Sequence, residues 1–297
     1  MIRVKKIAHG AYETPDLDRQ VEYYTDILGL NLIAREKDAA YLASTIDHHS
    51  VVLRKGGGGD RGQCVRIGFQ VGTDDDLDAF EKQTAAHGIK ITRKKDPEPS
   101  IADMVSFEDP KGTIMEVFKR GDFMHQKFPE KGIVPHKLGH IAFFVKDVKK
   151  ATDFYCDVLG FRVSDWMGDF FSFLRCGTDH HTINLMQDAD DRHFHTAFEL
   201  RDWGHMLTAC DHLSLNGYKL LWGPGRHGIG HNLFCYHRAP NGLITELFAQ
   251  LDQMNEALGY FEPRPWHRDR PQRPKVWAKD HTASNYWGIM PTDEMRK

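Results

Sequence analysis

Two histidines and one glutamate in the second half of the chain are of the types that bind a transition metal. His140 and His195 each begin a short apolar segment, and Glu246 lies within another, GLITELFA. Two imidazoles and one carboxylate form the donor set that holds Fe(II) by one face and leaves positions open to substrate and O2. A structural zinc site would normally include Cys, and none accompanies these residues. The three residues therefore predict an open, reactive metal site.

The chain carries one pattern twice, at an offset of about 131 residues. Residues 9–30 and 140–161 both begin with His, continue to an aromatic pair and close on D-(I/V)-L-G. Two further pairs keep nearly the same offset: Asp47-His48-His49 with Asp179-His180-His181, and Pro110-x-Gly112-x-x-x-Glu116 with Pro240-x-Gly242-x-x-x-Glu246. The chain therefore holds two copies of one fold.

Each repeat must position these residues with a strand, a helix and three more strands. Residues 140–147 alternate in the manner of a strand. Asp147 suits a helix N-cap and Gly160 a helix end. The apolar positions between them follow helical spacing, at Val148, Ala151, Tyr155 and Val158. Three strand candidates follow, at residues 161–167, 170–176 and 181–187.

A second unit completes the same half. It comprises a strand at 195–200, a helix ending near Gly217 and a hairpin over 231–249 that turns at 239–242. The first half repeats the plan at residues 65–71, 73–88 and 104–118. We expect an α+β fold of two tandem domains, each of two paired βαβββ modules. The expected divisions are a domain at 1–125, a linker at 126–137, a domain at 138–255 and an irregular tail at 256–297 that packs over the active site.

The first copy lacks part of the ligand set. His9 matches His140 and Glu116 matches Glu246, but Arg66 stands where the second copy has His195. A guanidinium cannot ligate a metal cation, although it can pair with a buried carboxylate. We therefore expect a structural, metal-free N-terminal domain.

More reactive residues follow in the run GPGRHGIGHNLFCYHRAPNGLITE. The run reads Gly225-x-His227, seven residues, Cys235-Tyr236, two residues, Ala239-Pro240-x-Gly242 and three residues to Glu246. It resembles the signature of the type I extradiol ring-cleavage dioxygenases of the vicinal oxygen chelate superfamily. Cys235 departs from it, because the signature has an aliphatic residue or Phe there. The resemblance covers roughly residues 1–255 and is most specific between 138 and 250.

The resemblance implies a function and a role for each residue. In the implied reaction, the ring of a substituted catechol is opened and both atoms of O2 are incorporated. Carboxylated catechols are among the implied substrates. The implied metal is a non-haem Fe(II), with Mn(II) as the alternative. His140, His195 and Glu246 would hold the metal, His181 would be the acid–base residue, and Tyr236 with His227 would contact the reacting groups. His180, next to His181, is expected on the opposite face of its strand. Arg270 and Arg273 of the tail, together with His231, are expected to bind substrate, and relatives form homo-oligomers, often tetramers.

The composition also limits which binding partners and classes of function remain. The net charge of −3 gives no general attraction to nucleic acid or to anionic membranes. Five scattered Cys indicate reduced thiols in a cytoplasmic protein. Two alternatives stay open: an O2-independent metal enzyme like the glyoxalases and fosfomycin-resistance proteins, or a non-catalytic small-molecule binding protein of the same fold.

Overall fold

The computed structural model describes residues 1–44, 47–56, 62–119, 121–124, 127, 129–262 and 272–295. The N-terminal half contains β1 (Lys6–Thr14), α1 (Leu17–Glu22), the π-helical turn η1 (Tyr23–Ile27), β2 (Asn31–Arg35), β3 (Ala39–Ala43), β4 (Val51–Lys55), β5 (Gln63–Gln70), α2 (Leu77–Ala85), β6 (Thr92–Glu98), β7 (Ile101–Glu108) and β8 (Ile114–Phe118).

The C-terminal half repeats this order and adds a tail. It contains β9 (Lys137–Val145), α3 (Val148–Asp157), β10 (Arg162–Met167), β11 (Phe171–Arg175), β12 (Ile183–Gln187), β13 (Arg192–Glu199), α4 (Trp203–Leu215), β14 (Leu220–Arg226), β15 (Leu233–Arg238) and β16 (Ile244–Ala249). After β16 come β17 (Met254–Asn255) and, in the tail, β18 (Tyr260–Phe261), β19 (Lys275–Trp277), α5 (His281–Ser284) and the 3-10 turn η2 (Asp293–Met295). The predicted α+β fold with two tandem repeats is confirmed.

Local sequence explains how α3 forms. The Asp147 side chain accepts a hydrogen bond from the Lys150 amide and so caps the helix. The apolar stripe predicted from the spacing is buried, and Gly160 adopts the left-handed φ of +75° that follows the helix end. The helix therefore lies against the sheet through the face that its sequence indicates.

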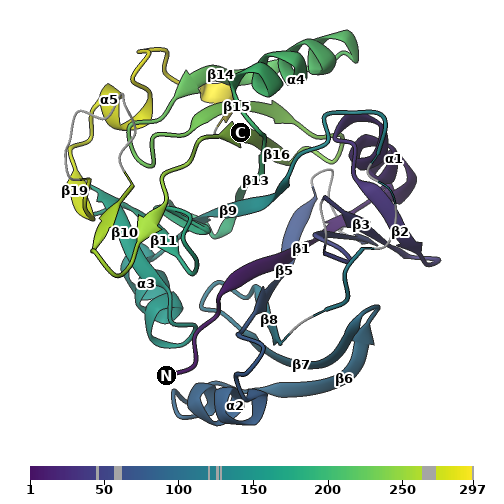
Figure 1. Cartoon of the computed structure of the whole chain (residues 1–297), viewed down its shortest axis with the longest axis vertical. Coiled ribbons are helices and arrows are strands. Elements are labelled where there is room, and N and C mark those ends of the chain that lie inside the picture. The colour runs from purple at the N-terminus through teal and green to yellow at the C-terminus, as the bar shows by residue number, and fades with distance from the viewer. Residues whose placement is uncertain are drawn as a thin grey trace.

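Each half forms one curled mixed sheet (Figure 1). The C-terminal order is β14-β15-β16-β13-β9-β12-β11-β10-β19, so β16, β13 and β9 are neighbours near its middle. In register, Ala197 of β13 lies opposite both His140 of β9 and Glu246 of β16. The small Ala197 side chain leaves space for the longer His140 and Glu246 side chains to meet above it. His195 lies two positions away on β13 and therefore on the same face.

The N-terminal sheet keeps the same register. Gly68 of β5 lies opposite both His9 of β1 and Glu116 of β8, and Arg66 lies two positions before it. The structure therefore confirms that Arg66 occupies the place of His195.

The two halves share one apolar core and several polar contacts, two of which lie next to the predicted ligands. Tyr12 Oη of β1 lies 2.7 Å from Thr196 Oγ1 of β13. Tyr23 Oη donates to Thr245 Oγ1 of β16 over 3.0 Å. Thr196 immediately follows His195, and Thr245 immediately precedes Glu246. The N-terminal half therefore contacts two strands that carry the predicted ligands.

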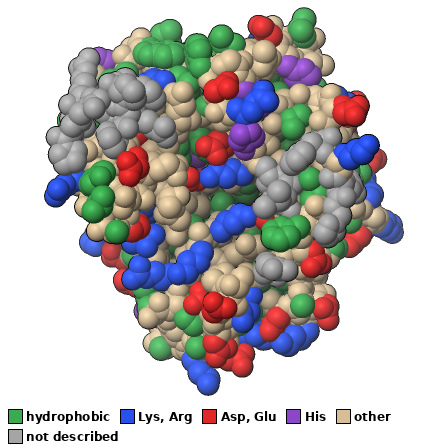
Figure 2. Space-filling model, in the orientation of Figure 1, with side chains coloured by type: hydrophobic (Ala, Val, Ile, Leu, Met, Phe, Trp, Pro, Cys, Tyr) green, Lys and Arg blue, Asp and Glu red, His purple; other side chains and the backbone are tan. Residues whose placement is uncertain are grey.

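A cavity of about 380 Å³ lies between the halves, lined in part by Lys111, Phe143 and Arg192. Lys and Arg side chains also surround a hollow near the centre of the face in Figure 2. None of the predicted metal ligands lines the cavity. Among the described residues, no helix has the length and apolar character needed to cross a bilayer.

Candidate metal centre

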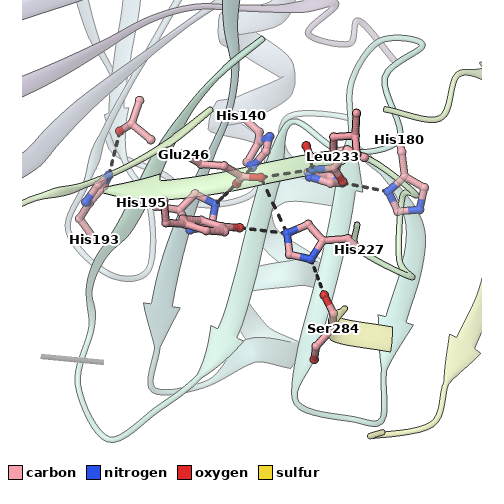
Figure 3. Close-up of polar contacts among 12 residues, drawn as sticks. His140, His180, His193, His195, His227, Leu233, Glu246 and Ser284 are labelled. Carbon is pink, nitrogen blue, oxygen red and sulfur yellow. Dashed lines mark hydrogen bonds and ion pairs between the residues drawn. The ribbon is translucent and has the colours of Figure 1, made fainter. Parts of the chain in front are cut away.

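His140, His195 and Glu246 converge at one point (Figure 3). His140 Nε2 lies 3.2 Å from His195 Nε2 and 3.0 Å from Glu246 Oε2, and His195 Nε2 lies 3.1 Å from the same carboxylate oxygen. Three ligands on one face of an octahedron, with bonds of about 2.1–2.2 Å, have donor atoms about 3.0–3.1 Å apart. The spacing and the chemistry of this donor set therefore fit a divalent metal held by one face.

The pKa shifts of Glu246 and His195 also suit the binding of a metal cation. Burial would raise the pKa of Glu246, but His140 and His195 beside it hold that pKa well below its usual value. Burial lowers the pKa of His195. All three side chains are buried. An ionised carboxylate and neutral imidazoles are the forms that bind metal.

His181 lies directly beside this ligand set. Its ring centroid is 4.4 Å from that of His140, and its Nδ1 is 2.9 Å from His180 Nδ1. Burial, followed by the charge of His140, lowers the pKa of His181 well below its usual value. The expectation that His180 lies on the opposite face of a strand is wrong, because β12 begins only at Ile183 and strand alternation does not apply to the preceding pair.

Tyr236 and His227 lie close to Glu246, with His227 Nε2 3.8 Å from Glu246 Oε1. His227 Nδ1 is 2.6 Å from the Ser284 carbonyl, which can only accept, so Nδ1 carries the proton. His227 Nε2 is therefore the acceptor toward Tyr236 Oη, at 3.1 Å. Burial lowers the pKa of His227 to about 4 and raises that of Tyr236 well above its usual value. Ser284 belongs to the tail and carries no sequence signal that would have predicted this contact.

Two of the three predicted substrate-binding residues, His231 and Arg273, are among the described residues. His231 is buried, and its Nδ1 lies 2.8 Å from Asp252 Oδ2. Arg273 is exposed. Arg270 lies outside the described residues. Binding of substrate by these three residues stays a prediction.

Arg66 makes the N-terminal copy different. Its Nη1 lies 2.6 Å from Glu116 Oε1 and 2.7 Å from Glu98 Oε1. His9 Nε2 lies 3.1 Å from Glu116 Oε2. Burial would raise the pKa of Glu116, but His9 and Arg66 lower it to about 2. His9, His49 and Glu98 also offer donor atoms within 4.8 Å of one another, but Glu98 already neutralises Arg66.

Comparison with known proteins agrees with the fold and the duplication. The family described as the glyoxalase/bleomycin resistance protein/dioxygenase superfamily matches residues 6–117 and again 137–247. The chain belongs to this superfamily.

Individual relatives within the superfamily are more distant. Metapyrocatechase 2 from Cupriavidus necator is 27% identical, with 84% of this chain and 82% of the relative covered. A manganese-dependent 2,3-dihydroxybiphenyl 1,2-dioxygenase from Geobacillus genomosp. 3 is 25% identical, with 92% and 93% covered. The crystal structure of a Mn(II)-bound glyoxalase from Novosphingobium aromaticivorans is 28% identical and superposes with a TM-score of 0.84, covering 97% of this chain and 92% of that one.

Proposed function

We propose that the protein is an extradiol dioxygenase, an oxidoreductase that opens the ring of a substituted catechol and incorporates both atoms of O2. The observation that carries this proposal is the convergence of His140, His195 and Glu246, with His181 next to His140 and the Tyr236–His227 pair next to Glu246. The names of the metapyrocatechase and dihydroxybiphenyl dioxygenase relatives support the same kind of reaction.

The protein residues have separable tasks in this proposal. A bound Fe(II), or alternatively Mn(II), supplies Lewis acidity and open positions for the diol and O2. Tyr236 directs its proton to His227 Nε2, so its oxygen is free to accept a hydrogen bond from a substrate hydroxyl. His227 can then take up the proton that the substrate loses. His181, next to His140, can accept a proton from the substrate and return it when the ring opens.

The remaining assignments concern the substrate and the assembly. We propose that carboxylated catechols are among the substrates, with Arg273 and Arg270 of the tail as the carboxylate contacts. We also propose a cytoplasmic homo-oligomer, with a tetramer favoured. All five cysteines are free thiols, which suits a reducing compartment.

A glyoxalase-like reaction without O2 is the second candidate, favoured by the Mn(II)-bound glyoxalase structure that superposes on the chain. The two reactions differ in whether O2 is consumed. The buried Tyr236–His227 pair beside Glu246 supports the dioxygenase, because it offers a base to a phenolic hydroxyl.

The test is to load the purified protein with Fe(II) or Mn(II) and to add a panel of mono- and bicyclic catechols, with and without a carboxylate. We expect one O2 consumed per ring opened and a yellow ring-fission product. His195→Ala should abolish both signals, whereas His136→Ala, a change of an exposed histidine, should preserve them. Absence of O2 uptake with every catechol, together with isomerisation of a hemithioacetal, would replace the proposal with the glyoxalase-like alternative.

A further inference from the structure

We propose that Asp165 and His180 are positioning residues that fix the tautomer and orientation of His181. This inference rests on the proposed function only for the acid–base task of His181. The contacts form a chain that leads away from the metal centre: His181 Nδ1 lies 2.9 Å from His180 Nδ1, and His180 Nε2 lies 3.0 Å from Asp165 Oδ2.

Donor and acceptor rules determine where the protons lie. Asp165 accepts at Oδ1 from the Lys275 amide and at Oδ2 from Trp277 Nε1, each over 2.8 Å. A carboxylate that accepts from two donors also accepts from His180, so His180 Nε2 carries a proton. The Nδ1 of a neutral His180 is then an acceptor, and the proton between the two rings belongs to His181 Nδ1. His181 Nε2 is therefore left without a proton and available to substrate.

Burial makes this arrangement specific. The Asp165 and His180 side chains are fully buried, and His181 is 3% exposed. The His180 ring also packs against Phe261, with ring centroids 4.7 Å apart. Water cannot replace a partner at such a site, so reversing either tautomer would bring two donors or two acceptors together. The other neutral tautomers of His180 and His181 are therefore higher in free energy here than they would be on a surface.

The N-terminal copy provides an internal comparison. Its equivalent pair keeps the same contact, with His48 Nδ1 3.0 Å from His49 Nδ1. The strands β2 and β10 share a register irregularity that aligns Ala34 with Asp165. The copy with Arg66 in its ligand set thus has the histidine pair but no carboxylate at this position. The N-terminal pair forms with Ala34 at this strand position, so the contact between the two histidines does not by itself account for Asp165.

The C-terminal tail helps to place Asp165. Both Lys275 and Trp277 belong to β19, which pairs in parallel with β10. Their two hydrogen bonds direct the carboxylate toward His180. The tail therefore contributes to the orientation of His181 through Asp165 and His180.

The test is ¹⁵N NMR of histidine-labelled, full-length protein, metal-free and with diamagnetic Zn(II), assigned with His181→Phe. We expect a protonated Nδ1 and an unprotonated Nε2 for His181. Asp165→Ala, which reproduces Ala34, should shift His181 toward the Nε2–H tautomer. Trp277→Phe removes one donor to the same carboxylate and should shift the tautomer less than Asp165→Ala, because Asp165 remains as the acceptor for His180.

Kinetics give a second measurement. Asp165→Ala should lower kcat by ~10²-fold, with the catechol KM and the metal content unchanged. A wild-type His181 protonated at Nε2, a tautomer unaffected by Asp165→Ala, or an unchanged kcat would each overturn the proposal. The wild-type spectrum is decisive even if the variant does not fold. Loss of the Nδ1–H tautomer in Asp165→Ala without any catechol turnover would uphold the positioning and reject the dioxygenase function.

Discussion

Replacing Arg66 with Leu should strongly destabilise the protein, because it leaves Glu98 and Glu116 buried without their shared cation. Glu116 is fully buried, and its pKa of about 2 lies below an ordinary value of 4.5. That difference corresponds to about 3 kcal/mol of interaction with the ionised form, divided between His9 and Arg66. Arg66 also pairs with Glu98, which is almost fully buried. We therefore expect Arg66→Leu to lower the free energy of unfolding by about 3–5 kcal/mol at neutral pH.

The sign of the pH dependence follows from the lowered pKa of Glu116. The stabilisation is complete above the unfolded value of about 4.5 and is lost as the pH falls through about 2. Arg66→Leu should therefore differ most from wild type at pH 7 and less in strong acid, where both states bind the proton.

Urea unfolding followed by circular dichroism measures this effect. Arg54→Leu is the matched control, because Arg54 also contacts Glu98 but its side chain is 39% exposed, so its loss should cost less than about 1 kcal/mol. If Arg66→Leu were no more destabilising than Arg54→Leu, Arg66 would not be the cation that neutralises Glu98 and Glu116 in place of a metal.

Three further predictions concern the histidines. Elemental analysis of the purified protein should find about one metal per chain. His195→Ala should abolish metal binding, whereas His9→Ala should not. Two metals per chain would show that the N-terminal half also binds metal. His181→Phe should keep the metal but lower turnover by ~10²–10⁴-fold, and normal turnover would exclude its acid–base role. Burial lowers the pKa of His237 to about 3, so the unfolded chain binds its proton first and stability falls as the pH drops below about 6.5. His237→Gln should reduce the slope of unfolding free energy against pH between 4 and 6 by up to about 1.4 kcal/mol per unit in urea titrations, and an unchanged slope would contradict this pKa.

The parts of the fold that follow a period were predictable from sequence. The duplication aligned His9 with His140 and Arg66 with His195, and the strand registers agree with both alignments. The α3 helix was predictable because its cap and its apolar stripe are local features. The β14 strand was not among the expected elements, since LLWGPGR contains two Gly and one Pro and does not alternate.

The contacts that complete the site depend on segments far apart in the chain. Asp165 and His180 are separated by 15 residues, and Trp277 reaches Asp165 from a further 112 residues away. Asp165 lies in an ordinary strand pattern, and nothing in its neighbourhood indicates a buried carboxylate. Its role is apparent only when three separate segments meet, which no local pattern encodes.

The hydrogen bonds of Tyr12 and Tyr23 across the molecule restrict how such a duplicated chain can change. Each tyrosine contacts a threonine next to a residue of the proposed metal-binding set, from the half that we propose to be metal-free. Under this proposal the N-terminal half could lose its own ligands, but it could not be deleted, because the C-terminal half would lose contacts to two of its central strands. A truncated protein that begins at the second repeat should therefore not form an independent enzyme, and it would not represent a simpler ancestral protein.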